Sequence, residues 1–180
     1  MTSRMGWFVL GIATTIVVLI AGGYVFVTSG GISMETTAQP LPFEKMVAGM
    51  AIRASIGDAA NDKSPLAPDE TNLMAGAQLF TKHCALCHGT PGQPRSAISK
   101  GMFPPPPRLF KQGEMDTNDP EGLIFWKVTH GIRLSGMPGF DGTLTATERW
   151  QLTMLLKHAD ALSPAVLAAL SQSAAQAPNP

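Results

Sequence analysis

The longest apolar run of the chain lies near its N-terminus. Residues 7–27 contain no charged side chain and are almost wholly apolar. At about 1.5 Å per residue, a helix of this length covers about 30 Å, the thickness of a bilayer hydrocarbon core. Trp7 and Tyr24 stand near its two ends, where aromatic rings favour the headgroup region. The pattern predicts a transmembrane anchor within residues 1–30.

A cleaved signal peptide is the alternative for this segment. Residues 21–23, Ala-Gly-Gly, resemble a small-residue cleavage site, but the apolar run continues through Val27. The apolar part of a signal peptide usually has about 7–15 residues. We therefore expect an uncleaved anchor. Arg4 precedes it and the first charge afterwards is Glu35, which favours a cytoplasmic N-terminus.

Residues 31–68 read as a linker that contains one short amphipathic helix. Apolar side chains recur with helical spacing at Phe43, Met46, Val47, Met50, Ala51 and Ala54. We expect this face to pack on the rest of the chain. Contact with the membrane surface or with a partner protein remains open.

Four further helices are expected after residue 68. The first begins at Asp69 or Thr71 and carries an apolar stripe, and a second begins at Thr145 or Thr147. Gly76 lacks a side chain that would hold a neighbour away, so we predict that these two helices cross, with Trp150 near Gly76 and Phe80. A short helix over 121–129 and a helix after Ser163-Pro164 complete the set. Alternating β-branched runs are scarce outside the N-terminus, so the prediction is an all-α fold.

Composition narrows the function classes. The chain has 180 residues and a formal net charge of zero, which gives no general attraction for nucleic acid. It has two cysteines, and both lie in the run Cys84-Ala85-Leu86-Cys87-His88. This C-x-x-C-H spacing is the attachment signature of c-type haem. Two thiols about one helical turn apart can reach the two vinyl groups of a porphyrin, and His88 then lies beneath the iron.

Other uses of the same residues are less favoured. A structural zinc site needs about four ligands, and no second ligand pair appears. A thioredoxin-like dithiol normally follows a strand in a βαβ pattern, which is absent from the sequence around it. A disulfide between Cys84 and Cys87 would close a very small loop and stabilise the fold little.

With these motifs in place, residues 70–160 resemble class I cytochromes c, in particular membrane-anchored bacterial monohaem cytochromes and the cytochrome c domains of respiratory oxidase subunits. The resemblance rests on Gly76, Phe80, the run Cys84–His88, Pro107-Arg108-Leu109, Gly136-Met137-Pro138 and Trp150. It implies one haem c, attached by thioethers to Cys84 and Cys87, inside a class I cytochrome c fold over residues 69–162. Residues 163–180 form a C-terminal extension.

Met137 is the predicted distal ligand. Residues 130–140 read as a helix end followed by a constrained loop, and Pro138 restricts the backbone next to the thioether. His130 is the main alternative, Met102 and Met115 have weaker context, and an open sixth position remains. Together His88 and Met137 form the predicted metal-ligand pair.

The proline run 104–107 cannot continue a helix. By resemblance, the carbonyl of Pro107 accepts a hydrogen bond from the second ring nitrogen of His88, and Leu109 packs against the haem. Pro106 or Pro105 can take this part instead. A surface polyproline recognition segment is the alternative use of the run.

The resemblance implies a one-electron carrier without catalytic residues or a small-molecule substrate. It places the haem domain in the periplasm, tethered by a single pass to the inner membrane of a bacterium. Its expected partners are the lipid bilayer and membrane redox complexes, respiratory or dehydrogenase, which it serves as a free carrier or as a fixed subunit. A haem peroxidase or gas-binding sensor with a displaceable sixth ligand is the competing class.

Overall fold

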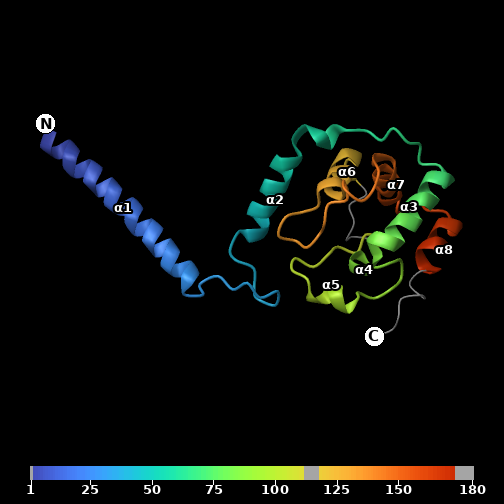
Figure 1. Ribbon diagram of the computed structural model, residues 1–180, viewed down its shortest axis with the longest axis horizontal. Coiled ribbons are helices and arrows are strands. Elements are labelled where there is room, and N and C mark those ends of the chain that lie inside the picture. The colour runs from blue at the N-terminus through green and yellow to red at the C-terminus, as the bar shows by residue number, and fades with distance from the viewer. Residues whose placement is uncertain (1, 112–117, 173–180) are drawn as a thin grey trace. The chain divides into compact units, whose positions relative to one another are not determined.

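The computed structural model describes residues 2–111 and 118–172, and this part of the chain is helical, with no strand (Figure 1). The elements in order are α1 (Thr2–Thr28), α2 (Glu44–Ile56), the 3₁₀ helix η1 (Gly57–Asn61), α3 (Glu70–His83), α4 (Ala85–His88), α5 (Ala97–Gly101), α6 (Glu121–His130), α7 (Ala146–Lys157) and α8 (Pro164–Gln172). The chain divides into two compact units between Phe43 and Glu44. The all-α prediction is confirmed.

The first unit consists of α1 and an irregular segment after it. Residues Arg4–Thr28 of α1 are long and apolar enough to cross a membrane, as judged by length and composition. The side chains of Trp7 and Tyr24 are exposed, as are the apolar side chains between them. The predicted N-terminal apolar helix is therefore present, and the apolar side chains along it are exposed.

The second unit begins with α2, where the predicted helix forms but the predicted packing face is wrong. Ile56 is 4 % exposed and Ile52 is half-buried, so this side of α2 faces its own unit. Met46, Val47 and Met50 are all more than half exposed. Apolar residues occur on both sides of this helix, so their spacing alone does not decide which side packs.

The segment after α2 lies along the beginning of α6. A Cβ atom added to Gly122 would collide with the backbone of Ala59 in η1. The backbone N–H of Ser64 donates a hydrogen bond to Glu121 Oε2 at 2.9 Å. These contacts hold the first turn of α6 against Ala59 and Ser64, which lie in the predicted linker.

The two long helices of this unit, α3 and α7, cross at Gly76. A Cβ atom there would collide with the carbonyl oxygen of Gln151 and would lie 3.0 Å from Leu155 Cβ. The predicted crossing is confirmed, but the residues that face Gly76 are Gln151 and Leu155. Trp150 instead stacks on Phe125 of α6, with ring centroids 4.0 Å apart.

The last described helix, α8, completes the core. Val166 and Leu170 are fully buried and belong to the same apolar cluster as Leu73, Ala77 and Phe80 of α3. The hydroxyl of Ser163 donates to Glu70 Oε1 at 2.8 Å, which ties the start of α8 to the start of α3. Residues 173–180 of the predicted extension lie outside the described part of the chain.

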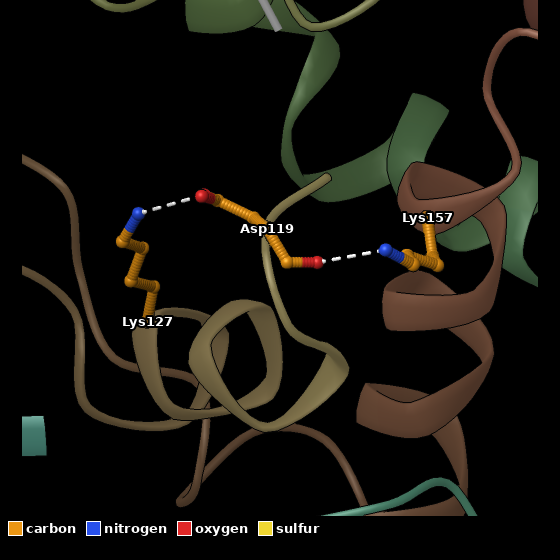
Figure 2. A network of polar contacts seen from close by, with 3 residues as sticks. All are labelled: Asp119, Lys127 and Lys157. Atoms are coloured by element: carbon orange, nitrogen blue, oxygen red, sulfur yellow. Dashed lines mark hydrogen bonds and ion pairs between the residues drawn. The ribbon is translucent and has the colours of Figure 1, made fainter. Parts of the chain in front are cut away.

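A small polar network ties the segment before α6 to α7 (Figure 2). Asp119 accepts two contacts from different lysines. Its carboxylate lies 3.4 Å from Lys127 Nζ of α6, and its backbone carbonyl accepts a hydrogen bond from Lys157 Nζ of α7 at 3.0 Å. Asp119 therefore links α6 to α7 through these two lysines.

Candidate functional site

The Cys-x-x-Cys-His run lies where α3 ends and α4 begins. Asp69 caps α3 by accepting a hydrogen bond from Asn72 N at 2.9 Å, one of the two predicted caps. The helix ends at Cys84, whose carbonyl accepts from His88 N at 3.0 Å. This single turn places both thiols and the imidazole within one short stretch that is anchored to α3.

The imidazole of His88 contacts the proline run. Its Nδ1 lies 2.9 Å from the carbonyl oxygen of Pro107. A carbonyl only accepts, so Nδ1 carries the proton and Nε2 holds the free lone pair. The pKa of His88 is lowered, mainly because the imidazole is buried. The hydrogen bond with Pro107 raises the pKa in part, and the nearby charge of Arg95 lowers it again. The imidazole is therefore neutral at neutral pH, which is the form that binds metals.

Two arginines hold the proline run beside the histidine. Arg95 Nη1 donates to the carbonyl of Pro106 at 2.7 Å, and Arg108 Nη2 donates to the carbonyl of Gln93 at 2.6 Å. The two bonds run in opposite directions between residues 93–95 and 106–108. Because Pro106 is engaged by Arg95, Pro107 supplies the carbonyl for His88. Sequence reasoning did not find the part played by Arg95.

Met137 lies in a tightly closed loop at the end of α6. Ile132 N donates to the carbonyl of Met137 at 3.1 Å, and the two residues form an isolated antiparallel bridge. Gly131 and Gly136 have φ angles of +68° and +74°, a conformation that side-chain-bearing residues rarely adopt. Ser135 Oγ donates to the carbonyl of Ile132 at 2.6 Å. The backbone that carries the thioether is thus fixed on both sides.

The alternatives to Met137 occupy different places. The ring of His130 is exposed and lies 4.9 Å from that of Trp126. Met102 is half-buried, and its methyl carbon would lie 2.9 Å from a Cβ atom on Gly136. Met102 therefore neighbours the Met137 loop, a proximity that the sequence does not reveal. Met115 lies outside the described residues.

Cys84 and Cys87 form no disulfide. Burial, with a smaller contribution from Cys87, raises the pKa of Cys84 to about 12. The first cysteine of a reactive dithiol motif has a lowered pKa instead, so this environment disfavours a thioredoxin-like function. Within residues 2–111 and 118–172, no group of three or more His, Cys, Asp or Glu side chains is placed to hold a metal ion. The cysteines have no companions there for a structural zinc site.

Apolar side chains surround the motif. Phe80 and Phe110 meet edge to face with ring centroids 4.9 Å apart. Leu109 and Phe140 are half-buried and pack, like Cys84, against the core cluster. The ring of Phe140 also lies 6.0 Å from that of His83. Phe110 and Phe140 were not among the predicted site residues, because only the fold brings them to the motif.

The comparison with protein families completes this picture. The family described as cytochrome C oxidase, cbb3-type, subunit III matches residues 71–154, which hold the motif, the proline run and the Met137 loop. This match supports a class I c-type cytochrome domain over residues 71–154. The searches of curated proteins and of solved structures found no match.

The residues of the cytochrome domain fit a haem c. The imidazole of His88 is neutral and oriented, with its Nε2 lone pair not used by Pro107. Cys84 and Cys87 are free and three residues apart, as two thioethers require. Half-buried apolar side chains, among them Leu109, pack beside them. The donor set is that of a covalent haem site.

Proposed function

We propose that this protein is a membrane-tethered one-electron carrier that holds a single haem c. Cys84 and Cys87 would form the thioethers, and His88 and Met137 would bind the iron. The observation that carries the proposal is the contact between His88 Nδ1 and the Pro107 carbonyl at 2.9 Å inside a Cys-x-x-Cys-His run. The membrane assignment is supported by the long apolar helix α1.

Each residue has a definite part in this function. When bound, haem c supplies an iron that takes up and releases one electron. The Pro107 carbonyl orients the imidazole of His88 and raises its basicity as a ligand. The closed loop around Ile132–Met137 presents a thioether, which raises the reduction potential relative to a second histidine. Leu109, which packs against the core cluster, would lie beside the haem and exclude water from it.

The proposed setting is the periplasmic face of a bacterial inner membrane. There the domain passes electrons between respiratory or dehydrogenase complexes, as a free carrier or as a fixed subunit of one of them. The family that matches residues 71–154 is named for an oxidase subunit, which supports membrane redox complexes as partners. The particle size in mild detergent separates the free carrier from the fixed subunit.

Two measurements on the full chain test the proposal. After expression with a haem-attachment apparatus, haem should migrate with the protein on a denaturing gel. The oxidised protein should also show the weak red absorbance band that methionine ligation to ferric haem gives. A colourless chain with two free thiols would contradict the proposal.

The Met137→Ala variant tests the distal ligand. We expect it to lose the red band and to bind carbon monoxide or cyanide readily, because its sixth position is open. Met102→Ala is the matched control, since Met102 lies beside the same loop. A band that survives in Met137→Ala and disappears in Met102→Ala would reassign the ligand. Wild-type protein that lacks the band and binds these ligands would favour a gas-binding or peroxidase function.

A further inference from the structure

Helix α2 presents an apolar face to its surroundings. Met46, Val47 and Met50 are 55 %, 58 % and 57 % exposed. The opposite side of the same helix, with the buried Ile56, packs on its own unit. The folded second unit therefore leaves this apolar face of α2 uncovered. Three large, exposed apolar side chains on one helical face indicate that this face contacts another apolar surface.

The position of α2 in the chain keeps it close to the proposed anchor. Helix α1 ends at Thr28 and α2 begins at Glu44, so residues 29–43 connect them. A flexible chain of this length has an end-to-end distance of about 20 Å. If α1 spans a bilayer, as proposed above, α2 stays within a short distance of its surface at a high effective concentration.

The charges of α2 suit a lipid surface. Helix α2 carries two basic residues, Lys45 and Arg53, and one acidic residue, Glu44 in its first turn; both basic side chains are exposed. Arg53 lies near the exposed face. A Cβ atom added to Gly49 would lie 3.8 Å from the guanidinium of Arg53. A basic side chain beside an apolar face, as Arg53 is, is typical of helices that lie in the headgroup region of membranes with anionic lipids.

The apolar face of α2 is too small to hold a partner protein by itself. A helix of 13 residues is about 20 Å long, and one face of it offers about 200 Å². A stable protein interface buries about 800 Å² on each partner. A bilayer needs no such area because α1 already holds the chain beside it.

We propose that α2 lies in the headgroup region of the bilayer that α1 spans, with Met46, Val47 and Met50 turned toward the acyl chains. This inference rests on the proposed membrane anchoring. It adds a second contact, which fixes the orientation of the cytochrome domain above the membrane.

The test is lipid photolabelling of the full wild-type chain. The protein is reconstituted in vesicles of phosphatidylcholine and phosphatidylglycerol that contain a diazirine phospholipid, and mass spectrometry locates the adducts after irradiation. We expect adducts in α1 and on Met46, Val47 or Met50, and none on Ala48. Ala48 is exposed but lies on the opposite side of α2 from Met50, because two residues turn a helix by about 200°.

Matched variants separate the face from the helix. Met50→Gln should lower the adduct yield in α2 several-fold and leave the yield in α1 unchanged. Ser55→Gln, an exposed position away from this face, should change neither yield.

The possible results are distinct. Adducts in α1 but none in α2 overturn this inference and leave the anchoring intact, whereas no adducts in α1 contradict the anchoring itself. Adducts spread equally over the exposed Leu86 and Leu134 would show indiscriminate partition and also overturn the inference. In a parallel sample treated with an amine-reactive cross-linker, a link from the exposed Lys45 of α2 to another protein or a second copy, without lipid adducts in α2, would assign the face to that partner instead.

Discussion

Arg95 acts on the haem site at the scale of one residue. Its guanidinium holds the Pro106 carbonyl at 2.7 Å, and the next carbonyl along the chain is the one that contacts His88. Its positive charge is also close enough to lower the pKa of His88, after the larger effect of burial. A nearby cation favours the reduced, less positive state of a redox centre. Arg95 therefore holds the proline run in place, and we expect its charge to raise the reduction potential of a haem bound at His88.

Replacing Arg95 by Gln should lower the reduction potential of the loaded protein, because the charge that opposes oxidation is lost. Arg95→Lys keeps the charge and should retain most of the wild-type potential. A spectroelectrochemical titration measures both. Equal potentials in Arg95→Gln and wild type would show that this charge has no influence on the site.

Glu148 gives a residue-scale dependence of stability on pH. Thr145 N and Oγ1 both donate to Glu148 Oε2 at 2.8 Å, and these two bonds lower the pKa of Glu148. A group whose pKa is lowered in the folded state stabilises the protein above its unfolded pKa. That contribution is lost as the pH falls through the folded pKa.

The free energy of unfolding should therefore fall from neutral to strongly acidic pH by less in Glu148→Gln than in wild type. The difference should be small and should shrink in salt, because the carboxylate is exposed. Denaturant titrations at several pH values measure it, with Glu35→Gln as the control for an acidic residue of the linker. Identical pH profiles for Glu148→Gln and wild type would rule out this contribution.

Residue identities were predictable where one short motif specifies them. Cys84, Cys87 and His88 are adjacent in the chain, and the family resemblance named Met137 and Pro107, which the fold places in a closed loop and against His88. Arg95, Phe110 and Phe140 were not predicted. Their partners are distant in sequence, so their parts follow from the folded backbone and from no local pattern.

At the scale of elements, the crossing of α3 and α7 depends on Gly76. Alanine normally favours a helix over glycine by about 1 kcal/mol. At Gly76 its Cβ atom would collide with the Gln151 carbonyl, so the two backbones must move apart.

We expect Gly76→Ala to lower the free energy of unfolding by about 1–3 kcal/mol, as overpacking does. Gly49→Ala in α2 is the matched control, because its Cβ atom would meet only the Arg53 guanidinium at 3.8 Å. That variant should be as stable as wild type or slightly more so. Thermal or denaturant unfolding compares them, and an unchanged Gly76→Ala protein would refute the tight crossing.

The elements themselves were more predictable than their packing. The caps Asp69 and Thr145 are local signals, and both helices begin where those signals stand. The face of α2 was predicted wrongly because apolar residues occupy two sides of it, and only the folded unit decides that Ile56 packs. Trp150 likewise turned to Phe125 of α6, a neighbour that no periodicity in α7 specifies.

At the scale of the whole molecule, the division into two units was only partly visible in the sequence. The apolar N-terminal helix and the all-α class follow from composition and periodicity. The sequence does not predict that α8 completes the core. Val166 and Leu170 belong to the same apolar cluster as residues of α3, although most of the second unit separates them in sequence. Contacts over such distances in the chain depend on the complete fold.

The place of α8 has a consequence for the order of events during biosynthesis. The ribosome makes Cys84 and Cys87 well before it makes Val166 and Leu170, the side chains that cover the far end of α3. If the chain crosses the membrane in the order in which it is made, both sulfurs emerge before α8 does. An enzyme that attached haem at that stage would reach both cysteines before Val166 and Leu170 complete the core.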